Sequence, residues 1–248
     1  REKCGIIKPD GVTVTSAGQP EEALSVIKAA AEERGNDIVI PDPGQTGYTD
    51  FGLDGIMIRY REIEAHLKLP GRHQAGNAAA AIETARALRE RYGYHISDEA
   101  IRQGLEAAYL PARQEVLCRR PLVLLDGAHN LQGIEALAET VKAHLKGRRT
   151  AVVMGLLRDK QYDECIGVMA RLCGKLFAVR PDNARALAAE EVAQVARKYG
   201  CDAAAYGDAD AAVRDALEFC GPEGAVVICG SLYMADRMRH AVARCCLK

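Results

Sequence analysis

The alternation of apolar runs and amphipathic stretches from residue 121 onward most constrains the fold of this chain. Apolar runs typical of buried strands occur at about 122–126, 150–155, 175–180, 202–206 and 225–229. Stretches with helical spacing separate them, at about 131–146, 161–173, 188–199, 208–219 and 234–246. This repetition predicts an α/β fold with a mostly parallel sheet and helices on both faces.

The first predicted strand, Leu122–Leu125, runs into the sequence Asp126-Gly-Ala-His-Asn130. Ligands of open α/β sheets gather at the carboxyl ends of the strands, so we expect Asp126, His129 and Asn130 to form a site there. Gly127 permits the sharp turn, and Asp126 is expected to face solvent. The alternative is that Asp126 or Asn130 only caps the following helix.

Further small and polar residues follow two other predicted strands. Asp159 and Lys160 come after Gly155 at the second strand, and Ser231 follows Gly230 at the last. Because the strands are expected to be parallel, these residues could share one edge of the sheet with Asp126.

The preceding residues have a less regular pattern. Val12–Thr15, a helix from Pro20 to Gly35 and Ile38–Ile40 predict a β-α-β unit with a buried second strand. Residues 41–55 are interpreted as a loop and 56–59 as part of a hairpin, and helices are expected at about 78–91 and after Ser97. Pro111 cannot continue a helix, so a domain boundary is placed there, giving domains 1–112 and 113–248.

A second polar cluster precedes the helix expected at 78–91. His73, Gln74 and Asn77 lie within about one helical turn at a helix N-terminus, where they could face one ligand, an anion in particular. The alternative is capping together with a solvated amide.

Composition narrows the function classes. The chain has 33 basic and 34 acidic residues and a net charge of -1, with no basic run, so small molecules are favoured over nucleic acid as partners. No apolar stretch approaches the ~18 residues of a membrane span. Nine cysteines without a CxxC pair indicate free thiols in a reducing cytoplasm. Neither GxGxxG nor the P-loop GxxxxGK[ST] occurs in the 248 residues.

Six motifs, taken in order and spacing, carry a family resemblance. They are Glu2–Lys8, Gly71–Asn77, Pro111–Arg113, Leu125–Asn130, Asp159–Lys160 and Cys229–Tyr233. Together they resemble the folylpolyglutamate synthase / dihydrofolate synthase family of Mur-type ligases. The resemblance implies that 1–112 is the remainder of a P-loop-type ATPase domain and that 113–248 is a Rossmann-like Mur-ligase C-terminal domain. Without the P-loop, the chain is expected to be inactive alone.

The resemblance also implies an ATP and Mg²⁺ site. It gives Asn77 as a partner of the adenine, Arg113 as a phosphate contact, and Asp126 and His129 as catalytic groups of the ATP site. Lys3 corresponds to a lysine that is carbamylated in such enzymes, and a carbamate offers Mg²⁺ the oxygen donors it prefers. The alternative for Lys3 is an ordinary surface lysine.

Four more residues complete the expected site. His73 and Gln74 are predicted to join the cofactor contacts, and Lys160 and Ser231 are predicted to contact substrate. A solvated loop lysine is the alternative for Lys160. Two departures from the family pattern, Cys4 in place of alanine and Leu131 in place of proline, are mild.

The implied activity is ATP-dependent ligation of L-glutamate to a folate or dihydropteroate carboxylate through an acyl phosphate, by a cytoplasmic monomer. Two alternatives stay open. One is another Mur-type ligase, such as a peptidoglycan-precursor or cyanophycin enzyme, which attaches a different amino acid. The other is a truncated homologue that binds without turnover.

Overall fold

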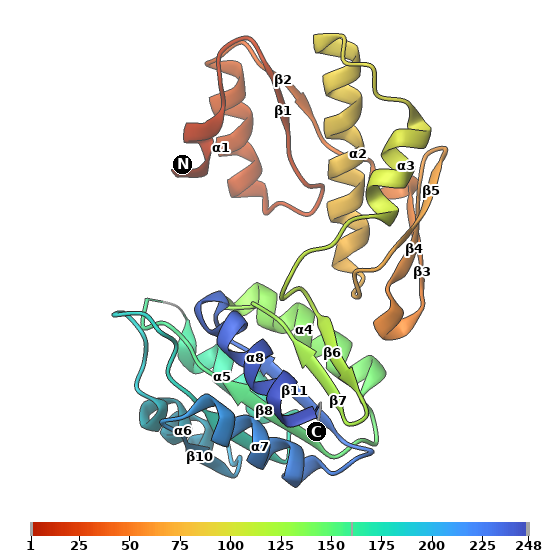
Figure 1. Cartoon of the computed structure of the whole chain (residues 1–248). Helices are drawn as coiled ribbons and strands as arrows, with labels where there is room; N and C mark the ends of the chain where they lie inside the picture. Colours follow the sequence, from red (N-terminus) through yellow and green to blue (C-terminus); the bar gives the residue numbers. More distant parts are fainter. Residues whose placement is uncertain (1, 160, 247–248) are drawn as a thin grey trace. The chain divides into compact units, whose positions relative to one another are not determined.

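A computed structural model describes residues 2–159 and 161–246 (Figure 1). Within these ranges the chain divides into two compact units, Arg1–Tyr109 and Leu110–Lys248, which are treated separately here as unit 1 and unit 2. The division falls slightly before the boundary expected at Pro111. Lys160 lies outside the described residues, so its predicted substrate contact stays a prediction.

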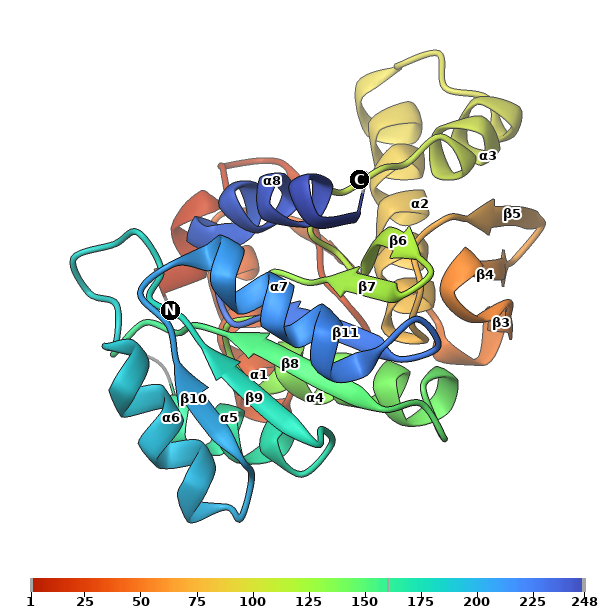
Figure 2. The same ribbon diagram turned by 60° about the horizontal axis from the view of Figure 1, so that its bottom comes forward.

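Unit 2 is built on a six-stranded sheet in the order β10-β9-β8-β11-β7-β6 (Figure 2). Neighbouring strands are parallel except for β6 and β7, which are antiparallel with an irregular register. The strands are β6 Glu115–Arg119, β7 Leu122–Leu125, β8 Thr150–Met154, β9 Lys175–Ala178, β10 Ala203–Ala205 and β11 Ala225–Cys229. The predicted mostly parallel sheet is therefore confirmed.

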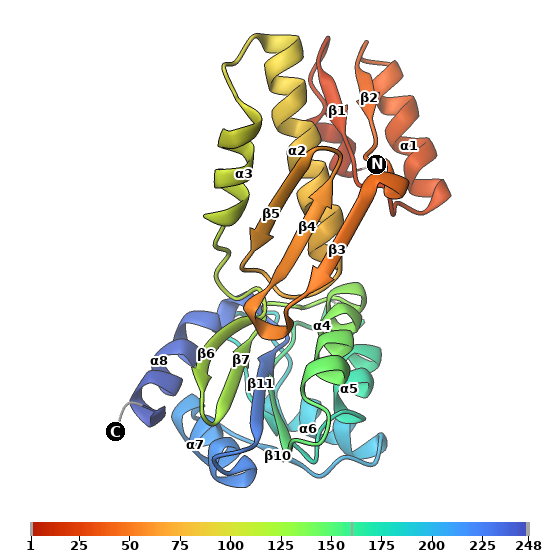
Figure 3. The same ribbon diagram turned by 90° about the vertical axis from the view of Figure 1, so that its right-hand side faces the viewer.

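Four helices connect the parallel strands, and a short 3₁₀ helix and a fifth helix follow the last strand. They are α4 Leu131–His144, α5 Tyr162–Ala170, α6 Ala189–Lys198, α7 Ala209–Cys220, η4 Leu232–Met234 and α8 Ala235–Cys246. Figure 3 shows α4 and α5 on one face of the sheet and α8 on the other, and α4 packs on α5, α5 on α6 and α7 on α8. Helices thus cover both faces, as the alternation predicts.

The central strands of unit 2 are buried on both faces. Every residue of β7, β8 and β11 is buried, which is why these strands are continuous apolar runs in the sequence. The edge strand β6 was not predicted. Its residues are half-buried or exposed and include Glu115 and Arg119, so it lacks the apolar signal by which the other strands were found.

Unit 1 begins with the 3₁₀ helix η1 Glu2–Ile6 and a β-α-β unit. The unit comprises β1 Val12–Val14, α1 Glu21–Glu32 and β2 Asp37–Val39, and its two strands pair in parallel, which confirms the prediction. The expectation that the second strand is buried was wrong. Asp37 is exposed and Ile38 and Val39 are half-buried, because β2 has only β1 as a partner within the described residues.

The rest of unit 1 is a three-stranded antiparallel sheet packed against helices. Its elements are η2 Pro43–Gln45, β3 Thr46–Asp50, η3 Gly52–Asp54, β4 Ile56–Tyr60, β5 Ile63–Leu67, α2 His73–Tyr92 and α3 Asp98–Glu106. The interpretation of residues 41–55 as a loop was incomplete. No residue of β3 is fully buried, so this strand is recognised by its pairing with β4 rather than by hydrophobicity.

The first turn of α2 also differs from expectation, because the helix begins at His73 and not at Ala78. Gly71 has a φ of 97°, a left-handed conformation that allows the chain to turn into the helix. Ala75 and Ile82 of this helix are buried in the core with Ile58 of β4. Among the described residues, none of these helices combines the length and the apolar character needed to cross a lipid bilayer.

Candidate functional site

The turn after β7 lies at the carboxyl edge of the sheet in unit 2. The Gly230 N–H donates to Ala128 O over 2.8 Å, and the Gly155 N–H donates to Cys229 O over 3.3 Å. An added Cβ at Gly230 would overlap the carbonyl of Gly155, so the ends of β7, β8 and β11 approach one another closely. The predicted convergence of Asp126, Gly155 and Gly230 on one edge is confirmed.

Asp126 does not face solvent, contrary to expectation. The residue is only 7% exposed. Both carboxylate oxygens accept hydrogen bonds from the backbone. Oδ1 accepts from the Ala128 N–H over 2.6 Å, and Oδ2 accepts from the Gln114 N–H over 2.9 Å. The carboxylate therefore ties the turn after β7 to the segment that precedes β6.

The electrostatic balance at Asp126 follows from this burial. Loss of hydration raises the pKa of the carboxyl above its ordinary value. The hydrogen bonds from Ala128 and Gln114 and the charges of Arg113 and His129 act in the opposite direction. These hydrogen bonds and charges therefore offset only part of the free-energy cost of burying the carboxylate.

The segment held by Asp126 is conformationally restrained. Ala112 and Gln114 have φ angles of 54° and 49°, a left-handed region that costs free energy for residues with a side chain. Three contacts hold it there: the Gly127 N–H donates to Ala112 O over 2.7 Å, the Thr140 hydroxyl donates to Gln114 Oε1 over 2.9 Å, and the Ala112 N–H donates to Glu115 over 2.9 Å.

These contacts fix Arg113, which lies between the two left-handed residues. An added Cβ at Gly127 would overlap the Leu232 side chain and would lie 3.0 Å from Arg113 Nη1. The guanidinium therefore lies against the glycine of the turn, and a glycine is required there for this approach. The structure brings Arg113 to the same edge of the sheet as Asp126 and His129.

His129 presents one ring nitrogen to the edge of the sheet. Its Nδ1 lies 2.9 Å from Gly127 O. Since a carbonyl oxygen can only accept, we assign the proton to Nδ1, which leaves Nε2 with a lone pair in the neutral ring. The ring is half-buried, and Nε2 is available to bind a hydrogen-bond donor.

Two other predicted residues of this edge act as helix caps. Asn130 Oδ1 accepts from the Gly133 N–H over 2.8 Å at the start of α4, so the capping alternative holds for Asn130. Ser231 is buried, and its hydroxyl accepts from the Tyr233 N–H over 3.2 Å at the start of η4. A substrate contact by Ser231 stays a prediction.

The second polar cluster lies in unit 1, in the first turn of α2. Gln74 is buried, and its Oε1 accepts a 2.9 Å hydrogen bond from Asn77 Nδ2. His73 and Asn77 are exposed. The three residues are neighbours on one turn, as predicted, and the Gln74 carbonyl orients the Asn77 amide.

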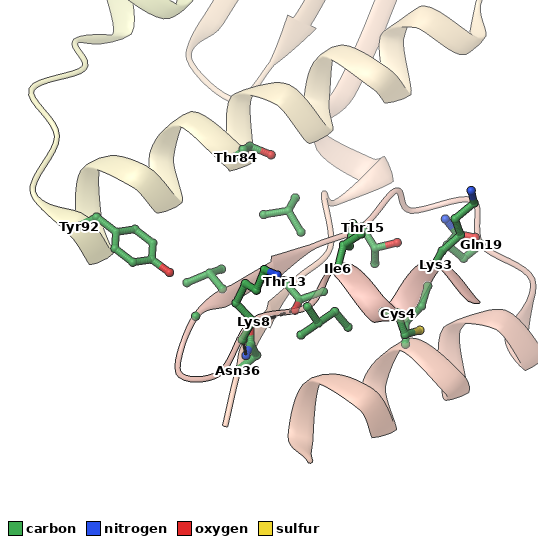
Figure 4. Close-up of a pocket in the computed structure, with 15 residues that line it drawn as sticks. Lys3, Cys4, Ile6, Lys8, Thr13, Thr15, Gln19, Asn36, Thr84 and Tyr92 are labelled. Carbon is green, nitrogen blue, oxygen red and sulfur yellow. Dashed lines mark hydrogen bonds between the residues drawn. The ribbon is translucent and has the colours of Figure 1, made fainter. Parts of the chain in front are cut away.

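Lys3 lies on the exposed surface of η1, at a cavity of about 500 Å³ in unit 1. Figure 4 shows Lys3 and Gln19 at one end of this cavity and Tyr92 at the other. The lining is largely apolar and includes Ile7 together with Val12 and Val14 of β1. Within the ranges described, no three His, Cys, Asp or Glu side chains cluster as a metal site would require.

Sequence analysis missed the residues that hold the Arg113 segment in place. Gln114 is bonded to Thr140, and Glu115 is paired with Arg239, with 2.6 Å between Oε2 and Nη2. Each pair joins two residues that are far apart in the sequence. A polar pair such as Gln114 and Thr140 has no periodic signature. Only the buried position of Gln114 in the folded chain marks it as a structural link.

About half of the chain matches a known protein family. Residues 112–232 match the family described as Mur ligase, glutamate ligase domain. The chain is 32% identical to a dihydrofolate synthase/folylpolyglutamate synthase of Bacillus subtilis over 96% of its own length and 56% of the relative's length. The chain thus spans about half the length of the curated relative it matches.

Solved structures resemble the chain as well. The Mycobacterium tuberculosis folylpolyglutamate synthase complexed with ADP superposes with a TM-score of 0.85 at 24% identity, over 96% of this chain and 57% of that one. A bifunctional folylpolyglutamate synthase/dihydrofolate synthase with Mn, AMPPNP and L-glutamate bound gives a TM-score of 0.75 at 25% identity, over 98% and 55%.

Residues 112–232 therefore form a Mur ligase C-terminal domain, and the α/β fold predicted for this part of the chain is that of the family. Over almost its whole length, the chain is homologous to the folylpolyglutamate and dihydrofolate synthases. The family resemblance carried by the six sequence motifs is confirmed.

Proposed function

We propose that this chain takes part in the ATP-dependent ligation of L-glutamate to the carboxylate of a folate or a dihydropteroate. The observation that carries the proposal is that Arg113 and His129 both lie against Gly127 at the carboxyl edge of the sheet in unit 2, Arg113 through its guanidinium and His129 through Nδ1. A guanidinium and a hydrogen-bonding imidazole suit a reaction whose participants are phosphates and carboxylates.

In this reaction a phosphoryl group passes from ATP to the substrate carboxylate, and the amine of glutamate then displaces phosphate from the acyl phosphate to form an amide. Arg113 would neutralise phosphate charge, which is the main task in phosphoryl transfer. Nε2 of His129 would accept a hydrogen bond from the glutamate amine. Asp126 would act as a positioning residue, because its oxygens are engaged by backbone N–H groups.

The residues present fit a nucleotide better than they fit a metal ion. In unit 2, Arg113 would hold phosphate oxygens. In unit 1, Asn77, which is oriented by Gln74 and lies on the same helical turn as His73, stays the predicted contact of the adenine. Mg²⁺ requires several oxygen ligands, whereas Lys3 could offer only a carbamate. No step is therefore assigned to Mg²⁺ on this chain, although it remains the expected metal of the reaction. A monomeric state and a cytoplasmic location belong to the same proposal.

The test is a chimera in which this chain replaces the homologous segment of the Bacillus subtilis relative. The expected result is glutamate-dependent phosphate release that requires a folate or dihydropteroate acceptor. Arg113→Ala should lower kcat by roughly a hundredfold, because one positioned transition-state contact is worth about 3 kcal/mol. A well-folded chimera that releases no phosphate would contradict the proposal and favour a non-catalytic homologue.

The choice of amino acid is tested separately with the chain itself. Titration calorimetry with L-glutamate, L-aspartate, L-alanine and L-lysine should show binding of L-glutamate alone. His129→Ala should weaken that binding, whereas Asn130→Ala, a change in a neighbouring helix cap, should leave it unaltered. Tighter binding of another amino acid would favour a different Mur-type ligase.

A further inference from the structure

Two cysteine thiols lie in contact in unit 2. Cys173 lies between α5 and β9, and Cys201 lies between α6 and β10, with 3.7 Å between their Sγ atoms. Both precede strands of the parallel sheet, so they lie at the amino edge, opposite the edge that carries Arg113 and His129. All nine cysteines of the chain are free thiols in this structure.

The backbone around this pair is fixed on both sides. The Gly174 N–H donates to Thr150 O over 2.8 Å, and the Leu176 N–H donates to Asp202 O over 2.8 Å. A salt bridge of 3.1 Å between Lys175 Nζ and Asp202 Oδ2 joins the same two segments. The two Sγ atoms are 3.7 Å apart and need to approach to the ~2.05 Å of a disulfide bond.

We propose that Cys173 and Cys201 are a modification site, at which a hydroperoxide oxidises the pair to a disulfide without rearrangement of the backbone. The thiolate of one cysteine attacks the O–O bond, giving a sulfenic acid and releasing water or an alcohol. The other thiol then attacks the sulfenic sulfur, the S–S bond forms and water leaves. The two thiols lose two electrons and two protons, and the hydroperoxide is reduced.

Either thiol can be the attacking group, because either Sγ can donate the hydrogen bond between them, and Cys201 Sγ also donates to Asp202 O over 3.3 Å. Cys201 is 7% exposed, so a small oxidant suits this site better than a bulky one.

The experiment uses the full chain, treated with hydrogen peroxide, blocked with N-ethylmaleimide and digested with trypsin. The predicted product joins the peptides 172–175 and 199–214, each of which contains one cysteine. The thermal midpoint of the oxidised protein should rise by roughly 5 to 10 °C, because the closed loop restricts the unfolded chain. A lowered midpoint would show that the bond strains the fold and would overturn the proposal.

Single variants test the order of events. In Cys173→Ser and in Cys201→Ser, the remaining cysteine should stop at the sulfenic acid and be trapped by dimedone, and the variant with the stronger labelling identifies the attacking thiol. Cys118→Ser, a change in the half-buried cysteine of β6, is the matched control and should form the linked peptide as the parent does. The proposal is wrong if oxidation gives sulfinic acids, or bonds to other cysteines, before the 172–175 and 199–214 peptides are joined.

Discussion

The β-α-β unit at the start of unit 1 and the one formed by β8, α5 and β9 in unit 2 have the same local design and very different burial. In both, two adjacent strands are parallel and one helix connects them. Every residue of β8 is buried, whereas every residue of β1 is only half-buried. β8 has a second neighbour, β11, while Val12 and Val14 of β1 line the cavity of unit 1. The burial of a strand therefore depends on its neighbours as well as on its own sequence pattern.

The largest expected effect compares matched valines in the two units. Val153→Ala in β8 removes methyl groups from a fully buried site and should cost about 3 kcal/mol of unfolding free energy, whereas Val14→Ala in β1 should cost below about 1 kcal/mol. Urea unfolding followed separately in the two units measures both values. Equal losses would show that β1 is as well packed as β8.

The next comparison concerns two glycines. Gly127→Ala should destabilise unit 2 by about 2 kcal/mol, because its Cβ meets the Leu232 side chain, whereas Gly18→Ala in unit 1 has open space and should be nearly neutral. Thermal unfolding measures the loss. Adding Leu232→Ala to Gly127→Ala should recover part of it, and a failure to recover would mean that Arg113 or the backbone, rather than Leu232, resists the new methyl group.

One carboxylate in each unit should make the stability of that unit depend on pH, and the two dependences have opposite directions. The pKa of Asp126 is raised by burial, so its contribution to stability is greatest below the ordinary value of 3.8 and declines as pH rises through the raised pKa. The pKa of Asp42 is lowered, mainly by its hydrogen bond with Gln45, so its contribution is present above 3.8 and is lost as pH falls through the lowered pKa.

Substitution of Asp126 tests this account and its positioning role. Asp126→Asn should remove the decline in unit 2 stability with rising pH, which urea unfolding at several pH values above 3.8 measures. Asp126→Ala should lower the unfolding free energy by about 1 to 2 kcal/mol, because two buried N–H groups lose their acceptor. An unchanged pH dependence in Asp126→Asn would contradict the assignment.

The smallest expected effect compares helix N-termini. Asn130→Ala removes the side-chain cap of α4 and should cost about 1 kcal/mol, measurable by hydrogen exchange in its first turn. Pro20→Ala at the start of α1 removes no capping hydrogen bond, since the proline provides none, and should change the exchange in α1 less. A larger effect at Pro20 would assign the stability of α1 to the restricted proline backbone.

The elements of unit 2 could be predicted from the sequence more completely than those of unit 1. The parallel strands and the helices of unit 2 were located within a few residues, because buried parallel strands are continuous apolar runs and amphipathic helices have a 3.6-residue period, whereas the half-buried edge strand β6 was missed. In unit 1, the hairpin expected around residues 56–59 is formed by β4 and β5, whereas β3 was missed and α2 was started at Ala78 and not at His73. The residues of Thr46–Asp50 are half-buried or exposed, and the strand pairs with β4 through its backbone. The periodicity of side chains does not detect such backbone pairing.

The sequence by itself determined the α/β class, the turn after β7 and the family to which its motifs point, because these depend on local periodicity and on residues adjacent along the chain. Only the tertiary structure decided that Asp126 is buried and bound to Gln114, that Arg113 lies against Gly127, and that two thiols from separate connections are in contact. These properties depend on which segments become neighbours. A carboxylate at a strand end is solvated or buried according to what packs over it, and no local pattern encodes that.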